Sequence, residues 1–345
     1  MMKDVMDAFN VSDNSKVIPI KQGLINQTYR CTDENNDLLL QQVNTNVFKN
    51  PLALQENYNT IYEHLQQKKN VFQIPKLIKR INNELLYRHD DGNYWRAFSY
   101  IANSFTFEKI TNEQSAFEAA QCYARFSAQL ADLSFTLIQY TIPHFHDLSF
   151  RFRQFEEALA GAELSVKKGV ANEIEKIFHH RYIPEFYHFI TSQPQRFRKY
   201  IMHHDCKISN ILFDATNNKI VCPVDLDTTM PGYFFSDLGD MIRSMGNNLP
   251  EDSTRLEEMQ LNSEIIQAIF EGYSNEISPY FTPDENTWLP FSGHILTYMQ
   301  ALRFLTDHLN KNIYYQVNYP LHNADRTKNQ LQFLQLLLQW KPWPE

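Results

Sequence analysis

The chain changes character once, near residue 103, and this change restricts the folds that it can adopt. The first part is typical of short strands separated by turns. Strands are expected at Lys16–Ile20, Gln27–Cys31, Leu38–Leu40, Leu85–His89 and Tyr94–Tyr100. Between the third and the fourth of these, Leu52–Lys68 has apolar residues at helical spacing and follows Pro51, which favours the first turn of a helix.

The rest of the chain has helical periodicity, apart from one island typical of strands at Ile201–Asp227. The expected helices are Asn112–Leu133, Phe150–Leu164, Val170–Phe189, Ser253–Tyr273, Thr287–Leu309 and Ala324–Gln339. We therefore expect an α+β protein with a small β-rich part at residues 1–102 and a large, mainly helical part at residues 103–345.

Length and composition fit two domains in a reducing compartment. A chain of 345 residues is long enough for about two domains, and its net charge of −8 argues against binding nucleic acid or an anionic membrane. The four cysteines form no C-x-x-C pair, so neither a disulfide framework nor a zinc site is expected. The first ten residues lack the apolar core of a signal peptide, and no run of about 18 apolar residues predicts a membrane span. We expect a soluble, cytoplasmic protein.

The β-type island contains the pattern H-x-D-x-x-x-x-N, formed by His203, Asp205 and Asn210. A two-residue turn at Asn217-Asn218 would make a hairpin in which Asn210 lies opposite Asp225. Amide and carboxylate oxygens suit Mg²⁺, which completes its coordination with phosphates and water. A nearby carboxylate such as Asp205 could accept the proton of an attacking hydroxyl. This pattern indicates metal-assisted phosphoryl transfer; the alternative is a surface hairpin with ordinary turn residues.

This segment resembles the catalytic and metal-binding loops of the aminoglycoside phosphotransferase/choline kinase-like superfamily, relatives of the protein kinases. Several stretches are similar to bacterial N-acetylhexosamine 1-kinases: Gly23-Leu24-Ile25-Asn26, Leu40-Gln41-Gln42-Val43-Asn44-Thr45, Tyr94-Trp95-Arg96-Ala97, Asp225-Leu226-Asp227-Thr228-Thr229-Met230-Pro231-Gly232, Asp237-Leu238-Gly239-Asp240 and Arg303-Phe304-Leu305-Thr306-Asp307. The resemblance implies a protein-kinase-like bilobal fold, ATP and Mg²⁺ as cofactors, and a small-molecule sugar substrate.

Roles follow from the resemblance position by position. Asp205 would be the catalytic base, and Asn210 and Asp225 would hold Mg²⁺ against the nucleotide phosphates. His203 would brace the catalytic loop, and Asp237 would anchor that loop from behind.

The same resemblance places nucleotide contacts in the first hundred residues. The turn with Gly23 and Asn26 would lie over the phosphates, and Tyr100 and Ala102 would belong to a hinge that binds adenine through its backbone. The family's third strand normally ends in a lysine or arginine that contacts the phosphates, whereas this chain has Gln41 and Gln42 there. Gln41 would still contact the nucleotide through its amide, but without a charge, so that affinity would depend more on Mg²⁺ or on another basic residue. Glu56 is the candidate for the acid that usually pairs with that lysine.

Residues of the second part are candidates for binding the acceptor: Asp227, Arg243, Arg303, Asp307, and Tyr314 or Tyr315 stacking on a sugar ring. Each has an alternative. Asp227 could instead be a second metal ligand or a solvated turn residue, and Arg243 a cation on a helix surface. Arg303 and Asp307, four residues apart, could form a surface ion pair.

Other patterns receive structural interpretations. Adjacent His203 and His204 would point to opposite faces of a strand, which argues against a shared metal. His144-Phe145-His146-Asp147 could be an acid/base or metal site, or a loop that caps the next helix with Asp147. Cys206 lacks an adjacent base and is expected to be inert. The apolar stripe of Leu331–Trp340 is expected to be core.

We expect an ATP-dependent kinase that phosphorylates the anomeric hydroxyl of N-acetylglucosamine or N-acetylgalactosamine. One alternative is a kinase of the same superfamily that acts on an aminoglycoside, choline or another amino alcohol. The other is a catalytically silent regulator that binds nucleotide or sugar, favoured only by the absence of the phosphate-contacting lysine. The sequence leaves the oligomeric state open.

Overall fold

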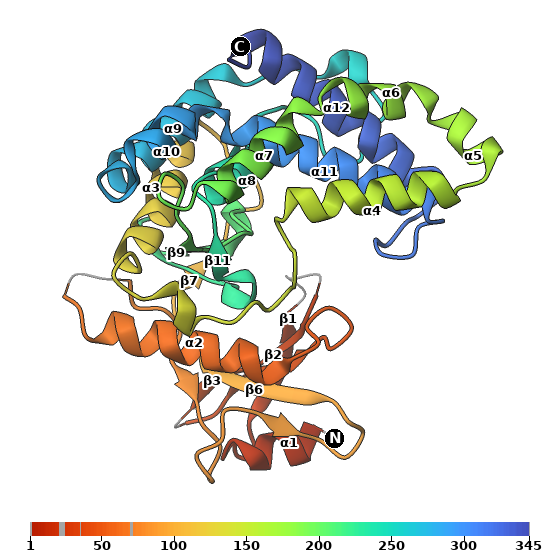
Figure 1. The fold of residues 1–345 in the computed structure, drawn as a ribbon. Coiled ribbons are helices and arrows are strands. Elements are labelled where there is room, and N and C mark those ends of the chain that lie inside the picture. The colour runs from red at the N-terminus through yellow and green to blue at the C-terminus, as the bar shows by residue number, and fades with distance from the viewer. Residues whose placement is uncertain (1, 21–24, 35, 70–71, 345) are drawn as a thin grey trace. The chain divides into compact units, whose positions relative to one another are not determined.

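The computed structural model describes residues 2–20, 25–34, 36–69 and 72–344 (Figure 1). It divides into two compact units, and each is described by itself. The first comprises Met1–Phe107, Gln129–Pro143 and Ser209–Pro231; the second comprises Glu108–Ala128, His144–Ile208 and Gly232–Glu345. Each unit thus draws on more than one stretch of chain. The division into lobes at residues 102 and 103 stays a prediction.

The first unit is built on an antiparallel sheet with the strand order β1-β2-β3-β6-β4, and β5 pairs with β6. The strands are β1 (Lys16–Ile20), β2 (Gln27–Thr32), β3 (Asp37–Val43), β4 (Leu77–Ile78), β5 (Tyr87–Arg88) and β6 (Tyr94–Ser99). The five strands predicted for this region are therefore confirmed, and the short strand β4 was not predicted.

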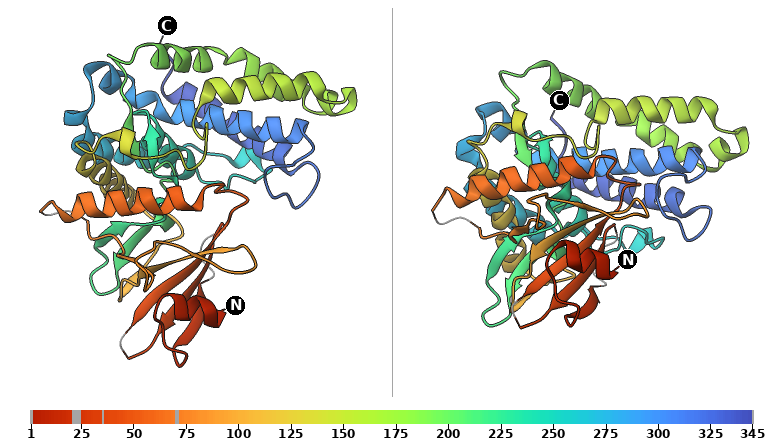
Figure 2. Two further views of the ribbon diagram at one scale, coloured as in Figure 1. Left: turned by 60° about the horizontal axis from the view of Figure 1, so that its bottom comes forward. Right: turned by 90° about the horizontal axis from the view of Figure 1, so that it is seen from below.

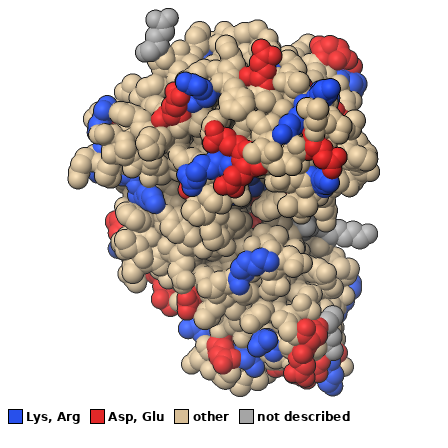
Figure 3. All heavy atoms as spheres, turned by 45° about the vertical axis from the view of Figure 1, so that its right-hand side comes forward, with Lys and Arg blue, Asp and Glu red and all other residues tan. Residues whose placement is uncertain are grey.

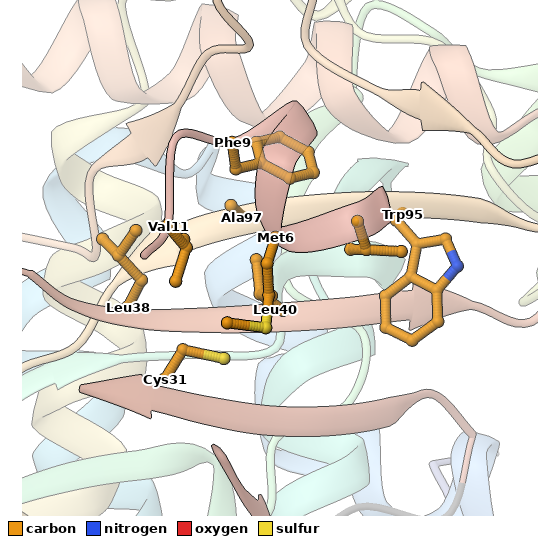
Figure 4. Close-up of a cluster of buried hydrophobic side chains, with 9 residues drawn as sticks. Met6, Phe9, Val11, Cys31, Leu38, Leu40, Trp95 and Ala97 are labelled. Atoms are coloured by element: carbon orange, nitrogen blue, oxygen red, sulfur yellow. The ribbon is translucent and has the colours of Figure 1, made fainter. Parts of the chain in front are cut away.

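Helices cover both faces of this sheet. Leu40 and Trp95 belong to a cluster of buried apolar side chains that includes Val5 and Met6 of α1 (Met2–Ala8) (Figure 4). The opposite face packs against α2 (Pro51–Gln66), as predicted, and Asn50 caps that helix by accepting a hydrogen bond from the backbone N–H of Ala53. Because successive side chains of a strand alternate between faces, the neighbours of Trp95 on β6 point toward α2.

The predicted hairpin forms, but its turn and register differ from the prediction. It consists of β9 (Ile211–Asp214) and β10 (Ile220–Pro223), and β7 (Ser104–Phe105) pairs with β9. The backbone N–H of Asp214 donates to the carbonyl of Lys219 at 2.8 Å, so the turn contains four residues rather than two.

This longer turn, together with an irregularity between Ile220 and Cys222, shifts the pairing by one residue. Val224 lies beside Asn210 and donates to its carbonyl oxygen at 2.8 Å, so the prediction that Asp225 lies opposite Asn210 is wrong by one position. Asp225 follows with φ 60° and ψ 54°, a left-handed conformation that aspartate tolerates better than most residues.

The second unit is mainly helical, and α11 (Ser292–Leu309) lies at its centre (Figures 1 and 2). It packs against α4 (Leu148–Gly161), α8 (Ser236–Met245) and α12 (His322–Trp340). Most residues of α11 are buried, and the predicted apolar stripe of α12 supplies buried Leu331, Leu334 and Leu337. The other helices are α3 (Glu113–Gln129), α5 (Leu164–Gly169), α6 (Ala171–His179), α7 (Tyr182–Ser192), α9 (Ser263–Ile277) and α10 (Pro283–Trp288).

Two predicted helices are each divided in the structure, and a proline accounts for each break. Val170–Phe189 becomes α6 and α7, because Pro184 has no N–H and its ring would clash with the carbonyl of His180 in a continuous helix. Thr287–Leu309 is interrupted in the same way by Pro290, which lies in a 3₁₀ turn between α10 and α11.

The helix predicted at Ser253–Tyr273 begins only at Ser263. The residues before it are bonded to Asn248, whose side chain accepts from the N–H of Gln260 and donates to the carbonyl of Glu258. Such side-chain bonds to the backbone compete with a helical path. Among all the helices of the described chain, none combines the length and the apolar character that crossing a bilayer requires.

Candidate active site

The loop that carries Asp205 follows β8 (Tyr200–Met202) in the second unit. Two acids of α8 accept hydrogen bonds from backbone N–H groups of this loop. Asp237, which is fully buried, accepts from the backbone N–H groups of His203 at 3.1 Å and His204 at 2.9 Å. It also accepts from the hydroxyl of Ser127 at 3.2 Å. These are the contacts that an anchoring acid needs, and the role itself stays a prediction.

A second carboxylate of α8, Asp240, bonds to the same loop. It accepts from the backbone N–H of Cys206 at 2.8 Å and from the guanidinium of Arg243 at 2.9 Å. Burial raises the pKa of Asp240, against the opposing charge of Arg243. Burial alone would lower the pKa of Arg243. The negative charges of Asp240 and Glu251 outweigh this effect of burial, so the pKa of Arg243 is raised. The sequence motif contained Asp240, but no role was predicted for it.

The Asp205 carboxylate is the most accessible acid of this loop, with 20 % of its side chain exposed. Lys207 Nζ lies 2.7 Å from Asp205 Oδ1. The backbone N–H of Asp205 donates to Nδ1 of the buried His203 at 3.3 Å. The His203 ring packs edge-on against Tyr123. A partly exposed carboxylate at this position is within reach of an acceptor hydroxyl in solution and could act as a base toward it. Cys206, between these residues, is buried, and burial raises the pKa of its thiol well above the ordinary value.

The predicted metal ligands Asn210 and Asp225 lie at the open end of the hairpin in the first unit. One amide oxygen and one carboxylate form a hard donor set that fits Mg²⁺ when phosphates and water complete the shell. Within the described chain there is no group of three or more His, Cys, Asp or Glu side chains arranged for a metal. Because Asp205 belongs to the other unit, its meeting with this pair stays a prediction.

The predicted nucleotide contacts that the structure describes are all in the first unit, whereas Gly23 lies outside the described residues. Tyr100 and Ala102 border the turn before β7, and the Tyr100 ring stacks under Arg30 at 3.8 Å. Glu56, the predicted partner of a strand-3 cation, accepts instead from the exposed Gln139 side chain.

A buried polar cluster, which the sequence analysis missed, surrounds Arg96 on β6. Arg96 is 3 % exposed and pairs with Gln41 across the β3–β6 ladder. Its guanidinium donates to Gln41 Oε1 at 2.5 and 2.8 Å, to Gln55 Oε1 at 3.1 Å and to Asp227 Oδ2 at 2.6 Å. The available signal was a charged residue inside the apolar strand pattern Tyr94-Trp95-Arg96-Ala97-Phe98.

Asp227 is therefore an internal acid of the first unit. Only 5 % exposed, it accepts from Arg96 and, at 2.8 Å, from Asn26 Nδ2, while Thr141 donates to its main-chain oxygen at 2.7 Å. The alternative of a solvated turn residue is wrong for Asp227, and its contact with a substrate stays a prediction.

In the second unit, the Arg303 guanidinium lies among aromatic rings and donates to the side chain of Gln300 at 3.2 Å; no ion pair links it to an acid of the described residues. Its guanidinium carbon lies 5.3 Å from the Phe145 ring, 5.5 Å from Tyr315 and 5.9 Å from the half-exposed Tyr314. Asp307 does not form the alternative ion pair: it is buried, and its oxygens accept from the backbone N–H groups of Tyr314 and Tyr315 at 2.8 and 3.0 Å.

More cations lie beside Arg303. Arg151 donates to the carbonyl of Phe145, and burial, reinforced by Arg303, lowers the pKa of Arg151 to about 10. His146 stacks on Phe145, and burial lowers the pKa of His146 well below its ordinary value, with His204, Arg303, Arg243 and Arg151 acting in the same direction. The neighbouring Asp147 caps α4 by accepting from the N–H of Phe150, as predicted.

The contacts thus gather the predicted residues into two sets. His203, Asp205, Asp237, Arg243, Arg303, Asp307 and Tyr314 belong to the second unit; Asn26, Gln41, Tyr100, Ala102, Asn210, Asp225 and Asp227 belong to the first. Within the second unit, the Phe145 ring lies beside both the Arg303 guanidinium and His204, and the centres of the Phe145 and His204 rings are 6.2 Å apart. His204 directly precedes Asp205 in the sequence.

A model of the phosphotransferase enzyme family matches residues 16–274. The microcompartment-associated aminopropanol kinase has a similar structure, with a TM-score of 0.69 and 14 % identity over 99 % of this chain and 98 % of that one. An aminoglycoside phosphotransferase from Alicyclobacillus acidocaldarius has a TM-score of 0.59 and 12 % sequence identity, and the match covers 98 % of this chain and 95 % of that one. A thermostable mutant of aminoglycoside phosphotransferase APH(4)-Ia, in a ternary complex with ADP and hygromycin B, has a TM-score of 0.56 and 9 % sequence identity, and the match covers 99 % of each chain. These likenesses confirm the expected fold class, a kinase-like α+β fold.

Proposed function

Because the chain belongs to the phosphotransferase enzyme family, we propose that it is an ATP-dependent kinase of a small-molecule hydroxyl, with an N-acetylhexosamine as its acceptor. The anomeric oxygen would attack the γ-phosphorus of ATP, the bond to the β,γ-bridging oxygen would break, and ADP would leave. The hydroxyl proton would pass to the Asp205 carboxylate. The similar phosphotransferase that contains ADP supports a nucleotide as the donor.

Contacts of the chain's own residues support this proposal. Asp237 and Asp240 fix the backbone around Asp205, so that its carboxylate is oriented before a substrate arrives. Asn210 and Asp225 would hold Mg²⁺, which neutralises phosphate charge when it is bound.

The surroundings of Arg303 are the observation that carries the choice of acceptor. An aminoglycoside, choline or aminopropanol is a cation at neutral pH, and it binds to acidic side chains or to the faces of aromatic rings that carry no cation of their own. Here Asp240 is paired with Arg243, Asp307 is bonded to backbone N–H groups, and Arg303 and Arg151 place positive charge around Phe145. Rings beside a guanidinium suit a neutral sugar that carries an amide carbonyl, which an arginine can bind.

A second candidate, a kinase of amino alcohols or aminoglycosides, is favoured by the likeness to an aminopropanol kinase and to aminoglycoside phosphotransferases. The two candidates differ in the charge of the acceptor, so an acceptor panel separates them. A catalytically silent relative would turn over no acceptor at all.

The test is ADP release by the purified protein with Mg·ATP and a panel of N-acetylglucosamine, N-acetylgalactosamine, glucosamine, aminopropanol, choline and aminoglycosides. We expect turnover with at least one N-acetylhexosamine and a product that has lost its reducing end, since phosphate on the anomeric oxygen blocks ring opening. Turnover with cationic acceptors alone would establish the second candidate. No turnover with any acceptor, in a protein that still binds ATP, would favour the silent relative.

A further inference from the structure

The buried cluster around Arg96 repeats, with different residues, an arrangement that kinases use to bind phosphates. In protein kinases a lysine on the third strand contacts the phosphates and pairs with a glutamate of the following helix. Here the strand position is the neutral Gln41 of β3, and Glu56, the predicted helix acid, bonds to Gln139 instead. The α2 residue that reaches the cluster is the neutral Gln55. The buried ion pair is formed instead by Arg96 of β6, directly opposite Gln41, and Asp227.

We propose that Arg96 supplies the positive charge that binds the phosphates of ATP, in place of the absent strand-3 lysine, with Asp227 as the acid that orients it. This inference rests on the proposed function and extends it. The positive charge would thus come from β6 instead of the neighbouring strand β3. The Arg96 side chain lies on the sheet face that α2 covers, because it donates a hydrogen bond to Gln55 of α2.

Three observations support a phosphate-binding role rather than a solely structural one. Asn26, which belongs to the turn predicted to lie over the phosphates, donates to the same Asp227 oxygen as Arg96 does. Asp227 lies two residues after Asp225, the predicted metal ligand. The guanidinium has five N–H donors, and its bonds to the described residues use four of them. A donor of Nη1 therefore has no partner among the described residues.

Burial explains why an acid must accompany this cation. A buried guanidinium is costly unless it is paired, and removing one partner leaves the other charge uncompensated. Gln41 and Gln55 offer carbonyl oxygens that orient the planar guanidinium without cancelling its charge. Among the described residues, Asp227 is the acid that forms an ion pair with Arg96 and so balances its charge before nucleotide binds.

The test compares nucleotides that differ only in their phosphates. Because Arg96→Gln alone would leave Asp227 unpaired, the main variant is Arg96→Gln with Asp227→Asn, which removes both charges from the buried pair. Dissociation constants for adenosine, ADP and ATP are measured with Mg²⁺ by calorimetry. We expect affinity for ATP and ADP to fall about ten- to a hundredfold, as for the loss of a charged hydrogen bond, and affinity for adenosine to stay within about twofold.

Two further variants make the result specific. Adding Gln41→Lys to that double variant returns a cation to strand 3, and we expect it to restore most of the affinity for ATP. Arg88→Gln makes the same change at an exposed arginine of β5, next to β6, and should bind ATP as the wild type does. Equal losses for adenosine and ATP, or unchanged affinity for ATP, would overturn this inference alone. A wild-type protein that binds no nucleotide would overturn the proposed function with it.

Discussion

Asp205 differs from the other acids around it in what its carboxylate contacts. Asp237 and Asp240 accept hydrogen bonds from backbone N–H groups of the loop, whereas Asp205 pairs with Lys207, whose side chain is half-exposed. An exposed pair of this kind contributes little to stability. Replacing Asp205 should therefore alter chemistry much more than folding.

We predict that Asp205→Asn lowers kcat by about 10²- to 10⁴-fold, the usual contribution of a general base, with little change in ATP affinity. The measurement is steady-state ADP release together with the dissociation constant for ATP. Asp284→Asn is the control, since Asp284 forms a surface ion pair with Arg196 and should leave kcat unchanged. If Asp205→Asn lost ATP binding and turnover in equal proportion, the assignment of the base would be wrong.

Arg303 should act on the acceptor rather than on ATP. We predict that Arg303→Gln raises the KM for the acceptor about tenfold or more, since a hydrogen bond to a charged donor contributes roughly 1.5–3 kcal/mol. The KM for ATP should stay the same. Arg255→Gln, at a largely exposed arginine paired with Glu258, is the matched control. A rise in the KM for ATP alone would show that Arg303 belongs to the nucleotide site.

The spacing of the sequence predicts some of these residues and cannot predict others. Asp205, Asn210 and Asp225 fall in one short segment, so their pattern is visible in the chain itself. The Arg96 cluster joins residues up to 131 positions apart, from Arg96 to Asp227. It depends on which side chains meet across the β3–β6 ladder and on the face of α2, and a single sequence does not specify either of these.

At the scale of elements, the strands could be predicted from turn residues and alternating side chains, and α2 from the helical spacing of its apolar residues and from Asn50 and Pro51 at its start. The errors have local causes. Pro184 and Pro290 break helices that apolar periodicity alone extends, and the four-residue turn after Asp214 shifts the hairpin by one position. The helix α1 was missed because seven residues give too little periodicity, although its Val5 and Met6 complete a core.

The element that carries both loop-binding acids is α8, and its packing against α11 depends on a glycine. A Cβ added to Gly239 would lie 2.5 Å from the carbonyl oxygen of Ser292 in α11, and neither backbone can move easily. Gly239 lies between Asp237 and Asp240, so a displaced α8 would also displace the bonds to the Asp205 loop.

We predict that Gly239→Ala destabilises the protein by about 1–3 kcal/mol, as overpacking of a core does, and lowers kcat as well. Thermal unfolding and ADP release measure the two effects. Gly161→Ala is the control: a Cβ there meets no atom within 4 Å, and we expect unchanged activity and equal or slightly higher stability. An unchanged melting temperature for Gly239→Ala would show that α8 and α11 can separate without cost.

At the scale of the whole molecule, charge is placed differently outside and inside. Basic and acidic side chains are interspersed over the face drawn in Figure 3. Inside the second unit, burial lowers the pKa of His294 to about 4 and that of His146 well below its ordinary value. Such histidines are neutral in the folded protein and gain a proton only when it unfolds. They should therefore make folding sensitive to mild acid.

The sign follows from proton binding. Between pH 6.5 and 4 the unfolded chain binds a proton at His294 that the folded protein excludes, so stability falls as the pH falls, by about 1.4 kcal/mol per pH unit for a buried histidine. Above pH 6.5 neither state binds the proton and the penalty disappears. Carboxylates paired on the surface, such as Asp284, lose their contribution only at lower pH, because their pKa is already below its ordinary value.

We predict that the melting temperature falls between pH 7.5 and pH 5.0, and that His294→Gln reduces this fall by the equivalent of about 2 kcal/mol. Glutamine keeps a donor for the carbonyl of Lys341, which His294 Nε2 contacts at 3.0 Å, and does not titrate. Scanning fluorimetry of both proteins across this range measures the difference. His188→Gln, at an exposed histidine of α7, should retain the full acid sensitivity. Equal falls for the wild type and His294→Gln would mean that the buried ring accepts its proton without unfolding.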